Sequence, residues 1–178
     1  MKFLKTFKIF ESEDNELLRK TESIDDYNPY DYSKIDSENS WKYANKFPTL
    51  FDKLLENNYS FETKPLGKTI LYGVVLKEPL KFYHGSDRLM KILKPMKVLI
   101  RGDKEKVLHL GDSTQAKSWG HYLYEVVIPK GVEIFQGPDG FNHVMVFDSL
   151  KPCSVNILPG WENYKDADYD KIKKEIEL

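Results

Sequence analysis

The stretch that decides the fold runs from residue 69 to residue 158, where short apolar runs alternate with turn residues. The runs are ILYGVVL (70–76), KFYHG (81–85), KVLIRG (97–102), KVLHLG (106–111), YLYEVVIP (122–129), VEIFQG (132–137), HVMVF (143–147) and SVNIL (154–158). They are rich in β-branched or aromatic residues, and Gly, Pro or Asp stands between them. Eight such runs in about 90 residues predict a mostly antiparallel sheet, with residues 69–158 as one sheet core.

Short helices are expected between these strands and at the end of the chain. Residues 86–93 and 113–119 each have room for one short helix, and Asp112 can begin the cap of the second. In residues 163–178 apolar side chains recur among Lys and Glu, which is typical of an exposed amphipathic helix.

The N-terminal part of the chain shows helical periodicity instead. Apolar residues at helical spacing alternate with lysines over residues 1–10, which predicts a short helix that either docks a partner or covers the core. A longer helical pattern covers residues 40–57, with a kink or break at Pro48. We therefore expect a helical N-terminal region over 1–62, followed by a sheet domain with a C-terminal helix over 63–178. The fold class is α+β.

Composition and charge narrow the classes of function. The single cysteine, Cys153, excludes an internal disulfide framework and a multi-cysteine zinc site, and it suits a reducing compartment. No apolar run approaches the roughly 18 residues of a membrane span, and lysines interrupt the apolar residues of the first segment. We expect a cytoplasmic protein with no membrane partner. The net charge of −1 provides no global field for nucleic acid.

Three histidines stand at the ends of apolar runs: His84, His109 and His143. Each alone reads as a hydrogen-bonded core histidine. Glycines follow the first two closely, however, and glycine lets the chain turn sharply and lets a ligand approach the backbone, so the two together suggest one cleft. Separations of 25 and 34 residues, without an HxH or HxxxH pair, do not indicate a metal site.

These motifs resemble the ADP-ribosyltransferases related to the poly(ADP-ribose) polymerases. The segment 82–86, FYHGS, resembles their first catalytic strand, and 107–111, VLHLG, with Ala116 beyond it, resembles their second motif. Most of these enzymes have Tyr where His109 stands, and this departure resembles the branch that contains the tRNA 2′-phosphotransferases. The segment 142–146, NHVMV, is similar to that branch's closing strand, so the resemblance covers about residues 80–150.

The resemblance implies a split antiparallel sheet of ADP-ribosyltransferase type, NAD as the cofactor, and a protein or nucleic-acid acceptor. It implies catalytic roles for His84, His109 and His143. The residues expected to bind NAD are Tyr83, His84, Gly85, Ser86, Arg101, His109, Trp119, Tyr122 and Asn142. Among these, Trp119 and Tyr122 are either stacking faces or core anchors, and Arg101 is either a diphosphate ligand or an exposed turn residue. The first ten residues also resemble a leader of bacteriophage proteins, which implies a host cytoplasm as the location.

The third motif contains no carboxylate where many of these transferases use Glu. His143 could act there as a general base, because an unperturbed imidazole has a pKa of about 6.5. Glu125 and Asp139 are substitutes in principle, but they also suit a solvated strand face and a turn. Two alternatives stay open. In the first, the domain is a catalytically inactive module that binds a nucleotide or a partner protein. In the second, it is an RNA 2′-phosphotransferase, an activity that requires several arginines to bind an internal RNA phosphate, whereas only Arg88 and Arg101 lie near the motifs.

Overall fold

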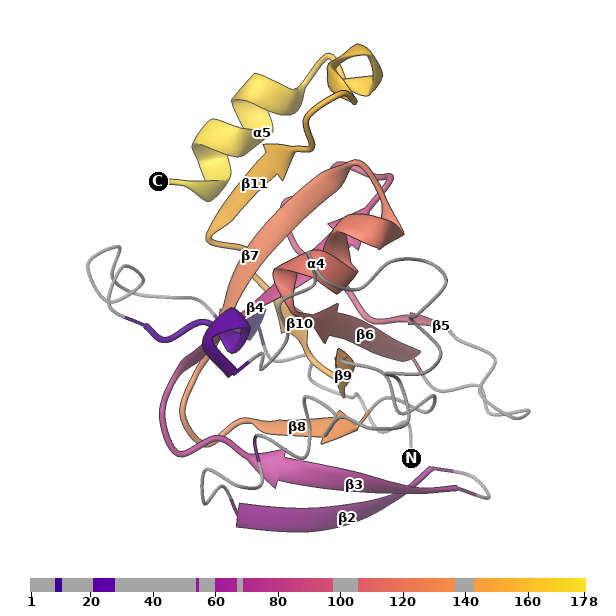
Figure 1. The fold of residues 1–178 in the computed structure, drawn as a ribbon, viewed down its shortest axis with the longest axis vertical. Coiled ribbons are helices and arrows are strands. Elements are labelled where there is room, and N and C mark those ends of the chain that lie inside the picture. Colours follow the sequence, from indigo (N-terminus) through magenta and orange to yellow (C-terminus); the bar gives the residue numbers. More distant parts are fainter. Residues whose placement is uncertain are drawn as a thin grey trace, which may run out of the picture.

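The computed structural model describes residues 9–10, 21–27, 54, 60–66, 69–97, 106–136 and 143–178. These residues form a mixed α/β protein with a mostly antiparallel sheet and few helices (Figure 1). No helix among them combines the length and the apolar character needed to cross a membrane.

One large sheet contains most strands of the described residues. Its strands are β2 (Ser60–Leu66), β3 (Thr69–Val75), β4 (Leu80–Ser86), β5 (Met96–Lys97), β6 (Lys106–Gly111), β7 (Tyr122–Ile128), β8 (Glu133–Gln136), β9 (His143–Val146) and β11 (Ser154–Ile157). The spatial order is β11-β7-β4-β6-β9-β8-β3-β2, with β5 on β6, and every described pairing in this sheet is antiparallel. Strand direction changes strongly between β11 and β2 (Figure 1).

The strand order places β6 between β4 and β9. Gly111 of β6 is the register partner of Tyr83 on one side and of His143 on the other. The three strands that carry the histidines of interest are therefore neighbours, although about 60 residues of chain separate the first histidine from the last.

The predicted strands are confirmed wherever the structure describes them. Every predicted run coincides with a strand except 97–102, of which only Lys97 is described, in β5. Strand β2 was not expected, and it crosses residues 62–63, where the sequence suggested a boundary. It forms because its whole length pairs with β3, from Ser60 opposite Val75 to Leu66 opposite Thr69.

A second, two-stranded sheet corrects one helix prediction. The strand β1 (Ile9–Phe10) pairs in parallel with β10 (Ser149–Leu150), so the predicted helix over 1–10 is wrong at its last two residues; residues 1–8 lie outside the described part. The helix expected over 40–57 also lies outside it, except for Leu54, which is helical and fully buried.

The described helices are short. They are η1 (Ile24–Tyr27), α4 (Ser113–Ala116), η3 (Lys117–Trp119), η4 (Glu162–Tyr164) and α5 (Tyr169–Ile176). The predicted helix after Asp112 is confirmed as α4 and η3, and the Asp112 carboxylate caps it by accepting from the Gln115 amide at 2.7 Å. The helix predicted over 163–178 is confirmed over Tyr169–Ile176 as α5, which buries Ile176; the exposed Leu178 lies beyond its end.

The core lies between the sheet and the segments that cross it. Phe82, Tyr122 and Tyr124 are its largest fully buried side chains from β4 and β7. Full burial of such a side chain stabilises the fold by about 1.5–3 kcal/mol. Ile24 and Leu54, which precede the large sheet in sequence, belong to the same cluster, so these two side chains pack against the sheet core.

The helix predicted over 86–93 is wrong. The Ser86 hydroxyl accepts from the Arg88 amide, and the Tyr124 hydroxyl accepts from the Met90 amide and donates to the Arg88 carbonyl. These bonds occupy backbone groups that a helix would need. After two bends, at residues 87–88 and 91–92, Leu93 forms an isolated bridge with Leu150, so the segment is irregular.

Candidate functional site

A cavity of about 760 Å³ opens where the ends of β4, β6 and β9 meet α4 and η3. The residues that line it are His84, Gly85, Ser86, Asp87, Arg88, Met90, Met96, His109, Gln115, Trp119 and His143. Its volume falls within the range of roughly 300–1,000 Å³ that is usual for cofactor and small-molecule sites. The prediction that His84 and His109 share one cleft is confirmed, and His143 joins them.

His84 has a fixed tautomer. Its Nδ1 lies 2.8 Å from the carbonyl oxygen of His109, and a carbonyl can only accept, so Nδ1 carries the hydrogen and donates. Burial lowers the pKa of His84 below its usual value of 6.5, although the bond to the His109 carbonyl opposes this shift. The ring is therefore neutral at pH 7, and Nε2 keeps a lone pair that can accept a hydrogen bond from a ligand.

Three rings cluster on another part of the cavity wall. The ring centres of His109 and His143 lie 5.1 Å apart, and that of Trp119 lies 6.5 Å from His109 and 5.8 Å from His143. Trp119 meets both imidazoles edge to face. His143 is buried, whereas His109 and Trp119 are half-buried, so these two present ring surface to a bound molecule.

Gly85 brings the helical segment onto β4. A Cβ placed on Gly85 would lie 1.8 Å from the carbonyl oxygen of Ala116 and 3.1 Å from the Cβ of Trp119. Only glycine allows this approach, and it positions α4 and η3 so that Gln115 and Trp119 reach the cavity wall. A second support comes from Asp25, whose carboxylate accepts from the Ser113 amide at 2.7 Å.

Gln115 contributes a polar atom to this wall. Its Oε1 is buried and has no hydrogen-bond partner among the residues that the structure describes. A buried carbonyl in this state costs about 1–3 kcal/mol, and a donor on a ligand removes that penalty. The cavity is thus suited to a molecule with an N–H group, such as a carboxamide or an exocyclic amine.

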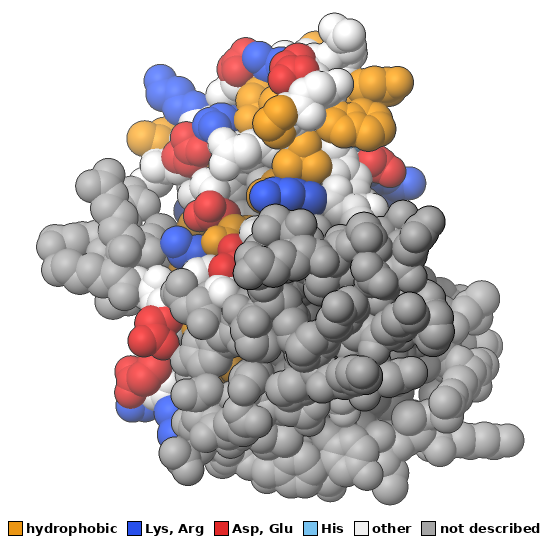
Figure 2. All heavy atoms as spheres, in the orientation of Figure 1, with side chains coloured by type: hydrophobic (Ala, Val, Ile, Leu, Met, Phe, Trp, Pro, Cys, Tyr) orange, Lys and Arg blue, Asp and Glu red, His pale blue; other side chains and the backbone are white. Residues whose placement is uncertain are grey.

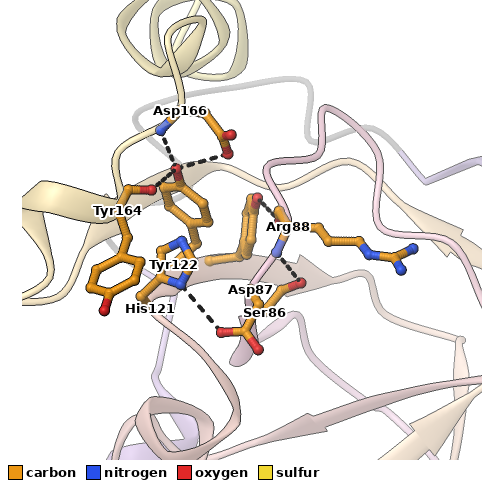
Figure 3. A network of polar contacts seen from close by, with 8 residues as sticks. Ser86, Asp87, Arg88, His121, Tyr122, Tyr164 and Asp166 are labelled. Atoms are coloured by element: carbon orange, nitrogen blue, oxygen red, sulfur yellow. Dashed lines mark hydrogen bonds and ion pairs between the residues drawn. The ribbon is translucent and has the colours of Figure 1, made fainter.

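The cavity also contains a carboxylate, that of Asp87. Asp87 follows β4 directly, and its side chain is 76% exposed at the cavity rim. Its Oδ1 lies 3.2 Å from Nδ1 of His121 (Figure 3). Of the two substitutes named from sequence, Glu125 lies outside the cavity wall and faces Lys81 at 3.8 Å. Asp139 lies outside the described residues.

The two tyrosines expected to stack on a ligand do not line the cavity. Tyr122 is fully buried, and its hydroxyl binds Asp166, donating to the carboxylate at 2.9 Å and accepting from the amide at 2.7 Å (Figure 3). Tyr83 belongs to the core, and its hydroxyl lies 3.1 Å from that of Ser23. Tyr122 is thus a core anchor, as the alternative interpretation held.

Two further residues expected from the sequence, Arg101 and Asn142, lie outside the described part of the chain. The sequence reasoning in turn missed Asp87 and Gln115 as wall residues, and it missed Tyr124, whose hydroxyl fixes the backbone of the wall residues Arg88 and Met90. Burial raises the pKa of Tyr124, which stays a neutral hydroxyl. Asp87 could have been found, because it directly follows the FYHGS motif.

Comparison of the chain with protein-family models, with curated proteins and with solved structures gives no match. Within the described ranges, no three His, Cys, Asp or Glu side chains are grouped so that they could hold a metal ion. What the site can do therefore follows from its own chemistry. It offers a neutral imidazole acceptor, a glycine edge, two partly exposed rings, an unsatisfied amide oxygen and a carboxylate.

Proposed function

We propose that this protein is an NAD-dependent ADP-ribosyltransferase with the split antiparallel sheet of that family, and that it modifies a protein or nucleic-acid acceptor. The observation that carries the proposal is the convergence of His84, His109 and His143 on one cavity beside the edge formed by Gly85 and Ser86. In this reaction the bond between ribose C1′ and the nicotinamide nitrogen breaks, nicotinamide leaves, and a nucleophile of the acceptor bonds to C1′. The proton of the nucleophile passes to a base.

His84 orients the ribose in this proposal. Its Nε2 accepts a hydrogen bond from a ribose hydroxyl, and the bond from Nδ1 to His109 holds the ring in the required tautomer. The backbone at Gly85 is open to the nicotinamide carboxamide, because glycine has no side chain to shield it. The Oε1 of Gln115 is an acceptor for an N–H of the same molecule, so the substrate would satisfy an atom that the protein leaves unsatisfied.

The exposed parts of His109 and Trp119 supply the stacking surface. They meet edge to face, so a flat ring that packs on one of them also meets the edge of the other. Arg88 is the described arginine of the wall, and its charge suits the diphosphate. An RNA 2′-phosphotransferase would need further arginines, and its substrate would be an internal RNA phosphate.

His143 is the candidate general base, and Asp87 is the candidate carboxylate. A neutral imidazole can take the proton of the acceptor as it attacks C1′. Asp87 lies at the open rim of the cavity, where a carboxylate can stabilise positive charge on the ribose or orient an incoming nucleophile. We expect the reaction to take place in the cytoplasm, because the single thiol of Cys153 suits a reducing compartment, and in a host cytoplasm if the chain comes from a phage.

The test is NAD binding and NAD cleavage by the full-length protein. A ligand at 100 times its dissociation constant stabilises the native state by about 2.7 kcal/mol, which corresponds to a rise in melting temperature of roughly 5–10 °C for a chain of this size. We expect this rise, we expect nicotinamide release when acceptor proteins are added, and we expect His84→Ala to abolish the rise.

The matched control is Glu125→Gln, which changes a carboxylate outside the cavity wall and should leave the rise intact. If millimolar NAD leaves the melting temperature of the wild type unchanged, the proposal is wrong. If NAD binds but no nicotinamide appears with any protein or RNA acceptor, the domain is a nucleotide-binding module instead.

A further inference from the structure

Two exposed aromatic rings lie on the buried ring of His121 beside the cavity. Trp161 is 45% exposed and Tyr164 is 62% exposed, and both contact the ring of His121. Trp161 stacks on His121 with ring centres 6.0 Å apart and an angle of 17° between the ring planes. The ring centres of Tyr164 and Trp161 lie 5.1 Å apart. We call His121, Trp161 and Tyr164 the aromatic platform. Figure 2 shows exposed hydrophobic side chains at the η4 end of the molecule.

Backbone and side-chain hydrogen bonds hold this platform in place. The amide of Tyr164 donates to the Trp161 carbonyl at 2.9 Å, and the amide of Leu158 donates to the His121 carbonyl at 2.8 Å. Beyond η4, the two bonds between the Tyr122 hydroxyl and Asp166 fix the chain to β7 (Figure 3). The rings are thus presented in one arrangement, so a partner would bind with little loss of conformational entropy.

Asp87 connects the platform to the cavity. Its carboxylate lies 3.2 Å from Nδ1 of His121 and also forms part of the cavity rim (Figure 3). A side chain resting on the platform would therefore have its end group close to Asp87. The acceptor in an ADP-ribosyl transfer has to approach the cavity from such a rim.

The charges of residues 161–170 favour a cationic partner, although Lys171, Lys173 and Lys174 follow in α5. Residues 161–170 contain four carboxylates, those of Glu162, Asp166, Asp168 and Asp170, and all four of these residues are exposed. The one cation of the segment, Lys165, pairs with Asp170 at 2.7 Å. Aromatic faces and carboxylates together attract guanidinium and ammonium groups, and they repel the phosphates of a nucleic acid.

We propose that the aromatic platform and Asp87 bind an arginine or lysine side chain of a basic protein segment, which is the acceptor. Its role as acceptor rests on the proposed transferase activity, but the binding itself does not require NAD. The cation lies over the face of Trp161 or Tyr164 and pairs with Asp87, at the rim from which the cavity is reached.

The experiment measures fluorescence anisotropy of labelled probes with the full-length protein in the absence of NAD. The probes are an arginine- and lysine-rich peptide, a peptide of the same length with the cations replaced by glutamine, and a single-stranded RNA. We expect the basic peptide to bind, its affinity to fall with added salt, and the other two probes to bind at least tenfold more weakly.

Variants assign the binding to the platform. Trp161→Ala should lower the affinity for the basic peptide at least fivefold. Leu178→Ala, which removes another exposed apolar side chain, should leave this affinity unchanged. Tighter binding of RNA than of the basic peptide, or equal affinity of Trp161→Ala and the wild type, overturns the proposal.

A separate NAD measurement keeps the two proposals apart. Trp161 lies outside the cavity wall, so Trp161→Ala should keep the rise in melting temperature with NAD, which also shows that the variant folds. If the wild type binds the basic peptide through Trp161 but shows no response to NAD, the transferase proposal fails and the cation site stands.

Discussion

Replacing Gly85 by Ala should disrupt the cavity by displacing its helical wall. The added Cβ would lie 1.8 Å from the Ala116 carbonyl oxygen and 2.9 Å from its carbonyl carbon, whereas real Cβ contacts stay beyond 3.0 Å. The opposing atoms belong to the backbone of α4 and cannot rotate away, so α4 must withdraw by about 1 Å or more. Gln115 and Trp119 move with it, and both line the cavity.

The expected loss of stability is at the upper end of the overpacking range, about 3 kcal/mol. For a chain of this size that lowers the melting temperature by roughly 6–12 °C. Thermal unfolding followed by circular dichroism measures this change, and the same experiment with NAD should show no ligand-induced rise in the variant.

Gly131→Ala is the matched control. Gly131 has φ of 80°, so alanine is strained there, but no atom lies within 4 Å of the added Cβ. The free energy of unfolding of this variant should fall by only about 1–2 kcal/mol, through backbone strain alone. Its melting temperature should still rise with NAD. If Gly85→Ala melts within about 2 °C of the wild type, a difference worth less than about 1 kcal/mol, the close approach of α4 to β4 is wrong.

Four further changes probe the cavity. Because the pKa of His84 is lowered in the folded state, the unfolded chain binds a proton at a higher pH than the folded chain does. As the pH drops below 6.5 towards the folded pKa, the free energy of unfolding should therefore fall, and the NAD-induced rise in melting temperature should fall with it. Thermal unfolding measures both. Gln115→Leu should leave the melting temperature without ligand unchanged or higher, because it removes the unsatisfied Oε1. It should also weaken NAD binding about tenfold, as measured by calorimetry, and an NAD affinity equal to that of the wild type would contradict the assigned role. His143→Ala should lower nicotinamide release by about 10² with NAD affinity nearly unchanged; a purely structural His143 would lower stability and preserve turnover per folded molecule. Tyr124→Phe should lower the free energy of unfolding, measured with denaturant, by about 1–3 kcal/mol, because the Met90 amide and the Arg88 carbonyl lose their hydrogen-bond partner.

The sheet could be predicted from sequence because its signals are local. Each predicted strand has apolar residues bounded by turn residues, and the cap at Asp112 requires only the following three residues. Strand β2 escaped prediction because its sequence, SFETKPL, has little alternation and contains Pro65; pairing with β3 decides its conformation. Residues 9–10 are likewise extended because they meet Ser149 and Leu150 across the fold.

The histidines of the site could be predicted and most of their surroundings could not. His84 and His109 have glycine close behind them, which is a pattern visible in one dimension. Gln115 reaches the cavity only because Gly85 admits α4 through its contact with Ala116, 31 positions further along the chain. The choice of Tyr122 as a stacking face failed for the same reason, since its hydroxyl is bound by Asp166, far along the chain.

Under the proposed function, two histidines and one carboxylate of the cavity would share the roles that a single glutamate has in many ADP-ribosyltransferases. Desolvation makes His84 a poor proton acceptor but leaves Nε2 able to accept a hydrogen bond, so in the proposed reaction it would orient the ribose and not transfer a proton. His143 packs against His109 and Trp119 within the wall, and an imidazole there can take a proton. The carboxylate, Asp87, stands at the exposed rim beside His121, on the side of the aromatic platform. A carboxylate in that position acts on the incoming acceptor more directly than on the buried wall. If the proposed function holds, the end of β4 supplies both the orienting His84 and the carboxylate of Asp87, and the start of β9 supplies the base, His143, so the reaction does not require a Glu in the third motif.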